Sequence, residues 1–293
     1  MVRKRWGSFA VCVGLLVVAA RLEAADTASG AVKVSKSGVI AVSHVVAYLV
    51  RNSRDARKPR TEILLSDVPV DPAPLRTALD PHMAAINLKP LDDRNYVLLW
   101  VDDAGAVTMN ATFSKTMTQF MNDTTEGLAV TWKTRSATRL DGHVTSKGTL
   151  KTMDGTTYVV DLTFAVDIPQ VVAGTPLPAG GGDPGKALLA FLAAAKRGDW
   201  AAVKAGSSPN ALEMFDKSYN SPKENATAAA QMLEAWIPKT KLTITGGELK
   251  PEGAFLNVEG EMFPGMRGLS IVQMVKKGTA WQFDQAAKVG LVP

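Results

Sequence analysis

The stretch "PQVVAGTPLPAGGGDPGKA" (Pro169–Ala187) divides the chain into two segments of different character. Three prolines and four glycines precede Asp183, and no hydrophobic period runs through them. A segment of that composition cannot bury a core and is typical of a linker. We therefore predict a first domain over residues 26–170, a Gly/Pro linker over 171–183 and a second domain over 184–293.

The same stretch nearly matches a phosphate-binding loop. Gly180, Gly185 and Lys186 fit the pattern G-x-x-x-x-G-K, but Ala187 stands where a Ser or Thr would hold magnesium. The preceding "GTPLPA" cannot form a central parallel strand, because proline removes donors from the ladder. We interpret the stretch as a linker running into a helix, with Asp183 as the N-cap and Pro184 at the first helical position. No cofactor is expected.

The N-terminus has the order of a secretory signal peptide. Basic residues 3–5 precede an uncharged apolar run over Phe9–Ala20, and small residues follow at Ala24 and Ala25. The run is shorter than the roughly 20 residues that a membrane-spanning helix needs. We predict a signal peptide over residues 1–25, export to the periplasm or the medium, and no membrane span after cleavage.

Removing this leader changes the composition. The only cysteine, Cys12, leaves with it, so the mature chain has no disulfide, thiol nucleophile or cysteine-ligated metal. The mature chain keeps 29 basic and 27 acidic residues, and its net charge falls from +5 to +2. Such a balance gives no electrostatic footprint for nucleic acid. The basic segment Arg51–Arg60 is interpreted as a solvated loop, with an anionic partner as the alternative.

Residues 30–170 alternate apolar and polar side chains between turn signals, which predicts an all-β antiparallel sandwich. Asp102–Gly105 predicts a turn, and Asp71–Ile86 predicts one helical insert interrupted by Pro81. The predicted strands are 42–50, 61–70, 96–101, 107–113, 128–134, 142–150 and 157–166.

The period changes to that of a helix after residue 184. One helix is predicted to end at Gly198, a short one to begin at the cap Asp199, and a third to run from Ser221 to Ile237. Alternating apolar and polar residues predict strands again over residues 241–249, 253–263, 268–277 and 281–285, with a hairpin turn at 277–278. Helices followed by an antiparallel sheet predict an α+β domain.

No recognised catalytic or metal-binding motif is present. The histidines His44, His82 and His143 are far apart in the sequence and lack the spacing of a metal site. The pairs Asp92–Asp93 and Asp102–Asp103 fit turns. We therefore expect no metal, no catalytic residue, and no histidine, acid and hydroxyl acting together.

Residues 184–287 resemble the nuclear-transport-factor-like cone fold, a superfamily that includes SnoaL-type and ketosteroid-isomerase-type proteins. The resemblance is carried by "ALLAFLAAAKRGDWAAV" (187–203), by the helix over 221–237 and by closing strands with Gly278 and Trp281. It implies a cystatin-like α+β domain. An isomerase-like site would need a Tyr and two pocket carboxylic acids, and this segment offers a single Tyr, Tyr219, in an apparent loop, and no His. The first domain resembles a β-domain found in exported bacterial proteins.

Three functions follow as hypotheses. The first is a non-catalytic envelope protein that binds a small apolar ligand or a protein. Its pocket would lie in the second domain, lined by Phe215, Met232, Trp236, Met274 and Trp281. The second is a SnoaL-like isomerase or hydrolase that uses Asp199, Asp216 or Tyr219. The third is a structural adaptor in the cell envelope, which an uncovered strand edge would favour.

Overall fold

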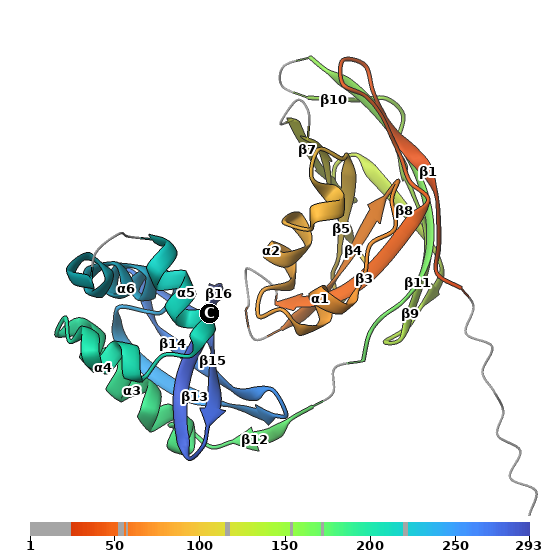
Figure 1. The fold of residues 1–293 in the computed structure, drawn as a ribbon. Coiled ribbons are helices and arrows are strands. Elements are labelled where there is room, and N and C mark those ends of the chain that lie inside the picture. Colours follow the sequence, from red (N-terminus) through yellow and green to blue (C-terminus); the bar gives the residue numbers. More distant parts are fainter. Residues whose placement is uncertain are drawn as a thin grey trace, which may run out of the picture.

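A computed structural model describes residues 25–51, 56, 58–114, 118–152, 155–170, 173–218 and 222–293. In this part of the chain the strands form three antiparallel sheets (Figure 1). The predicted predominance of antiparallel β-structure is confirmed. Except for Ala25, the predicted signal peptide lies outside the described residues, and so does Ser221.

The first sheet, called the outer sheet, lies on the side of the molecule away from the C-terminal part (Figure 1). Its order is β2 (Gly38–Ala41), β1 (Thr27–Val34), β11 (Thr157–Asp167), β9 (Arg139–Ser146) and β8 (Leu128–Arg135), and β10 (Leu150–Lys151) also pairs with β11. Strands β1 and β2 were not predicted from the sequence. The start of β1 does not alternate apolar and polar side chains. One of its residues must be a glycine, because a Cβ at Gly30 would lie 2.1 Å from the carbonyl oxygen of Asp161.

The inner sheet packs one face against the outer sheet. Its order is β3 (His44–Arg51), β4 (Pro59–Ser66), β5 (Tyr96–Val101), β6 (Val107–Phe113) and β7 (Thr118–Asp123). Side chains of both sheets, among them Val32, Ile63 and Phe164, share one hydrophobic core. The other face of the inner sheet is covered by α1 (Ala73–Thr77), α2 (Pro81–Ile86) and the 3-10 helix η1 (Lys89–Leu91). Both faces of β4 are thus covered, and residues 62–66 are all buried.

The helical insert is confirmed with its interruption. Pro81 occupies the first turn of α2, where no amide donor is needed, and Asp80 caps the helix by accepting from the backbone N–H of Met83 at 2.9 Å. This cap fixes the direction from which α2 approaches the inner sheet. The predicted turn at Asp102–Gly105 is also confirmed by a backbone hydrogen bond between these two residues.

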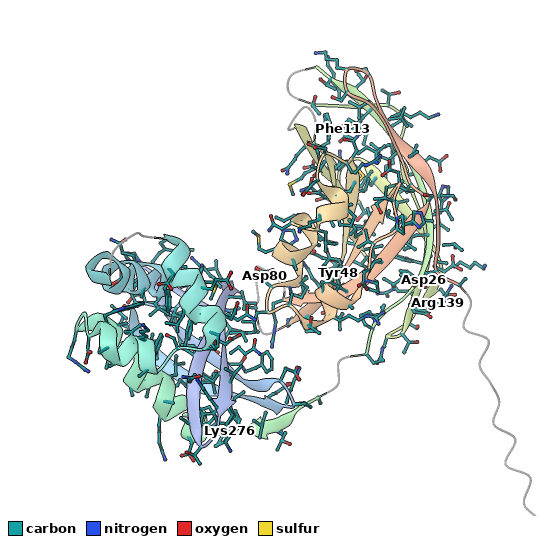
Figure 2. All side chains as sticks on the ribbon, in the orientation of Figure 1. Asp26, Tyr48, Asp80, Phe113, Arg139 and Lys276 are labelled. Atoms are coloured by element: carbon teal, nitrogen blue, oxygen red, sulfur yellow. The ribbon has the colours of Figure 1, made fainter. Side chains whose placement is uncertain are left out.

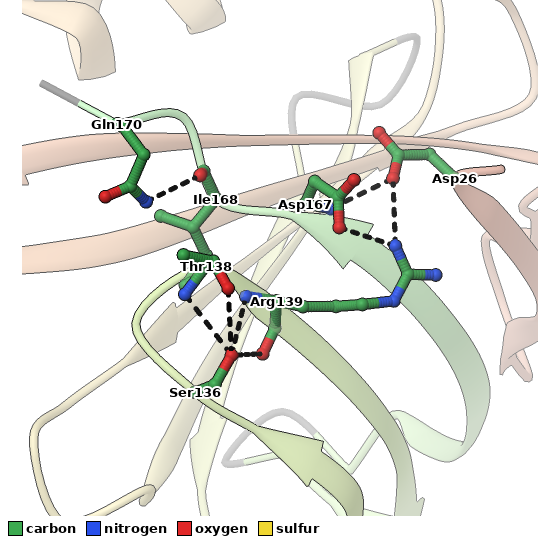
Figure 3. Close-up of polar contacts among 7 residues, drawn as sticks. All are labelled: Asp26, Ser136, Thr138, Arg139, Asp167, Ile168 and Gln170. Atoms are coloured by element: carbon green, nitrogen blue, oxygen red, sulfur yellow. Dashed lines mark hydrogen bonds and ion pairs between the residues drawn. The ribbon is translucent and has the colours of Figure 1, made fainter. Parts of the chain in front are cut away.

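A polar clamp holds the start of β1. Arg139 forms an ion pair with Asp167 at 2.6 Å and lies 3.8 Å from Asp26, whose carboxylate accepts from the backbone N–H of Asp167 at 2.9 Å (Figure 3). The clamp joins three neighbouring strands at one end of the outer sheet. Strand β1 is therefore fixed from its first residues.

The C-terminal part consists of an antiparallel sheet with helices on one face (Figure 1). The sheet order is β12 (Thr175–Leu177), β13 (Thr240–Lys250), β14 (Gly253–Phe263), β15 (Met266–Lys277) and β16 (Ala280–Leu291). The helices are α3 (Gly182–Lys196), α4 (Trp200–Ala205), α5 (Pro209–Ser218) and α6 (Pro222–Trp236). No helix in the described residues is both long and apolar enough to cross a membrane.

The junction between the two parts differs from the expectation. Strand β12 lies within the predicted linker and pairs with β13, so Pro176 occupies an edge strand, where proline is tolerated. Helix α3 begins at Gly182 with Gly181 as its N-cap and no side-chain cap. Asp183 is therefore not the cap, and it pairs instead with Lys186 on the exposed first turn. The prediction of Asp199 as the cap of α4 is confirmed.

One contact joins the connection between β3 and β4 to the C-terminal sheet. Ala56 is completely buried against Leu269 and Val292, and its backbone N–H donates to the carbonyl of Leu291 at 3.0 Å. The face of the C-terminal sheet that carries no helices thereby faces α1, α2 and the ends of β3 and β4.

Candidate functional site

A row of large side chains crosses three strands on the helix-covered face of the inner sheet. Tyr48 on β3 is paired in register with Glu62 on β4, and Glu62 is paired with Trp100 on β5. Because alternate residues of a strand share a face, Arg60 lies on this same face, one pleat along β4. Figure 2 labels Tyr48 within this sheet and Asp80 at the start of α2.

Glu62 is the centre of this group. Its side chain is 0% exposed, and its two oxygens have different partners: Arg60 Nη2 at 3.0 Å and His82 Nδ1 at 2.9 Å. The guanidinium of Arg60 also lies over the ring of Trp100, 4.7 Å from its centroid. His82 meets Trp100 edge to face, with 6.2 Å between ring centroids. We call Tyr48, Arg60, Glu62, His82 and Trp100 the Glu62 cluster.

The cluster perturbs the protonation of its members. The hydrogen bond to Glu62 raises the pKa of His82 above its usual value, against a smaller lowering by burial, and Asp80 adds to the rise. Burial, followed by the charge of Glu62, raises the pKa of Tyr48 far above the usual range. Tyr48 therefore stays a neutral phenol, while His82 keeps its proton to a higher pH than a free histidine.

Three buried polar atoms of the cluster have no hydrogen-bond partner among the described residues: Tyr48 Oη, Arg60 Nε and Trp100 Nε1. Tyr48 Oη lies beside Glu62 but not in normal hydrogen-bond geometry. Buried polar groups are nearly always paired in folded proteins, and each exception calls for an explanation. Three such atoms together with two shifted pKa values make the cluster a candidate functional site.

A cleft of about 490 Å³ opens beside the cluster. Arg60 and His82 belong to both the cluster and the cleft wall. The volume lies within the range typical of small-molecule sites. The inner sheet and its helices contribute one wall, from Leu49, Val50, Arg51, Pro59, Arg60 and residues 76–82; the C-terminal sheet contributes the other, from Glu248, Lys250, Glu252, Phe255, Asn257, Ile271, Lys288 and Val289.

The sequence analysis missed this arrangement. His82, Glu62 and Tyr48 converge from a helix and two strands, although Tyr48 is not hydrogen-bonded to the other two; that no histidine, acid and hydroxyl act together stays a prediction. The solvated-loop interpretation is wrong for Arg51 and Arg60, which are half-buried strand residues; positions 54 and 57 lie outside the described residues. One signal was available: Glu62 is the only charged residue in "EILL", a run that is otherwise apolar.

The other polar candidates stay apart. His143 pairs with Asp161 at 2.8 Å on the exposed outer sheet, and His44 begins β3. Asp199 caps α4 by accepting from the backbone N–H of Ala202, and Asp216 is exposed on α5. Tyr219 lies outside the described residues. Among the described residues, no group of three or more His, Cys, Asp or Glu could hold a metal ion.

The five predicted pocket residues lie together between the helices and the C-terminal sheet. Phe215 and Met274 are completely buried in the core there, and Met232, Trp236 and Trp281 pack against it. None of the five lines the cleft. Their packing is that of a hydrophobic core, and ligand binding by them stays a prediction.

Comparison with protein families, curated proteins and solved structures finds no match to this chain.

Proposed function

We propose that this protein is an exported, two-domain ligand-binding protein and that its ligand occupies the cleft beside the Glu62 cluster. The β-sandwich would be the first domain and a SnoaL-like cone domain the second. The order of helices and strands after Gly182, with a core between the helices and one sheet face, supports the resemblance. The cleft carries the proposal, because it brings apolar surface and several charged and polar groups together around one space.

Native mass spectrometry of the protein purified from its own host tests this function. We expect the wild type to retain a small molecule. Asn257→Trp would fill the cleft from β14, whereas Thr243→Trp places the same ring on exposed β13, outside the cleft. The ligand should be lost from Asn257→Trp and retained by Thr243→Trp. Retention of the same molecule by Asn257→Trp would place the site elsewhere.

A second candidate, an isomerase or hydrolase, is favoured by one observation. Glu62 orients His82 through Nδ1, and Nε2 has no hydrogen bond within the described residues although the ring lines the cleft. A histidine held in this way by a buried carboxylate is suited to act as a general base. Activity on a panel of esters and amides should fall about 100-fold or more in His82→Gln and stay unchanged in His143→Gln. Equal activity of wild type and His82→Gln would exclude this candidate.

A further inference from the structure

Arg76 brings an unpaired positive charge to the cleft. It lies on α1, its side chain is exposed, and its guanidinium has no ion pair or hydrogen bond within the described residues. Arg60 and His82 reach the same wall from the Glu62 cluster. Glu62 accepts hydrogen bonds from both and offsets part of their positive charge, whereas the Arg76 guanidinium has no carboxylate partner among the described residues.

The carboxylates around the cleft are largely engaged. Asp80 accepts from the backbone N–H of Met83 as a helix cap. Glu248 pairs with Lys250 at 3.4 Å. Glu252 is exposed at the rim. The cleft lining holds five Arg and Lys side chains against three carboxylates, before His82 is counted. The excess of cations favours an anionic group.

Part of the opposite wall is an apolar patch among charged residues. Phe255 and Ile271 lie half-buried on the face of the C-terminal sheet that carries no helices, and Val289 adjoins them on β16. Lys250 lies over the ring of Phe255, 5.3 Å from its centroid, so its aliphatic stem extends this surface. The cations of α1 and α2 thus line the same cleft as an apolar patch of the C-terminal sheet.

We propose that the ligand is a small amphipathic anion, a molecule with a carboxylate or phosphate head and an apolar body. Arg76, Arg60 and His82 bind the head, and Phe255, Ile271 and Val289 contact the body. This inference rests on the proposed ligand-binding function and adds the chemical class of the ligand.

Isothermal titration calorimetry tests the assignment with four compounds that share an eight-carbon chain: octanoate, octyl phosphate, 1-octanol and octylammonium. Octanoate and octyl phosphate should bind at least about tenfold more tightly than octanol, because their charged heads form charge-assisted hydrogen bonds that a hydroxyl head does not. Arg76→Gln should weaken octanoate binding about tenfold and leave octanol binding unchanged. Arg197→Gln, an exposed arginine at the end of α3, is the matched control and should change neither.

The outcomes distinguish a failure of the anionic assignment from a failure of the proposed ligand-binding function. If octanol binds as tightly as octanoate and Asn257→Trp abolishes both, the cleft is the ligand site and the anionic assignment is wrong. If no compound binds and mass spectrometry finds no retained molecule, both proposals fail. Inorganic phosphate and phosphatidylglycerol vesicles complete the set. Binding to vesicles without binding of the free anions would indicate a lipid surface and overturn the small-molecule assignment.

Discussion

At the scale of single residues, burial decides what an ion pair contributes. In the part of the chain that the structure describes, two histidine–carboxylate pairs have nearly equal lengths, His82–Glu62 at 2.9 Å and His143–Asp161 at 2.8 Å. Glu62 is 0% exposed, whereas the side chain of Asp161 is 73% exposed. Removing one member of a buried pair leaves a charge without compensation, but an exposed pair is screened by solvent.

We therefore expect Glu62→Gln to lower the free energy of unfolding by about 2 kcal/mol. This is less than the loss of 3–5 kcal/mol for a fully buried pair, because Arg60 and His82 keep some contact with solvent. Asp161→Asn should cost less than about 1 kcal/mol. Urea unfolding at neutral pH measures both. Equal losses in the two variants would show that Glu62 is not held as the structure shows.

The pH dependence of His82 follows from the direction of its shift. The hydrogen bond to Glu62 raises the folded-state pKa of His82 above the unfolded value. Its protonated form therefore stabilises the fold fully below the unfolded pKa, and this contribution is lost as the pH rises through the folded pKa. Arg60 opposes this shift and Asp80 supports it.

His82→Gln should accordingly cost more stability at pH 6 than at pH 9. The difference should be below about 1 kcal/mol, because a third of the His82 side chain is exposed. Unfolding in urea at the two pH values measures it, and His143→Gln is the control. A larger loss at pH 9 would contradict the sign.

The Glu62 cluster shows why the site was hard to predict from the sequence. Its members come from strands β3, β4 and β5 and from helix α2, and only the strand register and the cap at Asp80 bring them together. Alternation predicts which residues share a face of one strand, but not which strands are neighbours. Glu62 within an apolar run was the local sign, and its partner His82 lies 20 positions away.

At the scale of elements, Gly185 shows what the phosphate-loop-like stretch does. A Cβ at Gly185 would lie 1.9 Å from the carbonyl oxygen of Gly180, so the first turn of α3 packs directly on the chain that precedes it. Gly180, Gly181 and Gly182 all have positive φ angles, between 61° and 83°. The glycines thus build a tight entry to the helix rather than a slack tether.

Gly185→Ala should therefore destabilise the protein, although alanine is favoured over glycine in a helix by about 1 kcal/mol. Overpacking against a backbone oxygen costs about 1–3 kcal/mol, and we expect a net loss of about 1–2 kcal/mol. Thermal unfolding measures it. Lys186→Ala, on the exposed face of the same turn, should change the stability by less than about 0.5 kcal/mol. A more stable Gly185→Ala protein would refute the close approach.

Elements with a clear period were predicted from the sequence, and those held by long-range contacts were not. Strands β5, β6, β14 and β15, which are apolar-rich or alternating runs of the sequence, lie where expected. Strand β12 has three residues, one of them a proline, and exists because β13 offers an edge. Helix α5 was missed although Ala211 and Phe215 are buried in the core and Met214 packs against it.

At the scale of the whole molecule, the cleft depends on how the C-terminal sheet is held against the inner sheet. The described contact is small: Ala56 against Leu269 and Val292, with one backbone hydrogen bond to Leu291. The chain passes between the two parts through the segment that leads from β11 to β12. A contact of this size can hold the C-terminal sheet against the inner sheet only if its few atoms pack closely.

Ala56→Asp tests this dependence. An aspartate there would bury a charge between Leu269 and Val292, and burying an unpaired charge is strongly unfavourable, so the contact should open. We expect the radius of gyration measured by small-angle scattering to increase and octanoate binding to weaken, while the melting transition of each sheet core is retained. Ala137→Asp, in an exposed turn of the outer sheet, is the control. If Ala56→Asp keeps the wild-type scattering and affinity, this contact does not hold the cleft together.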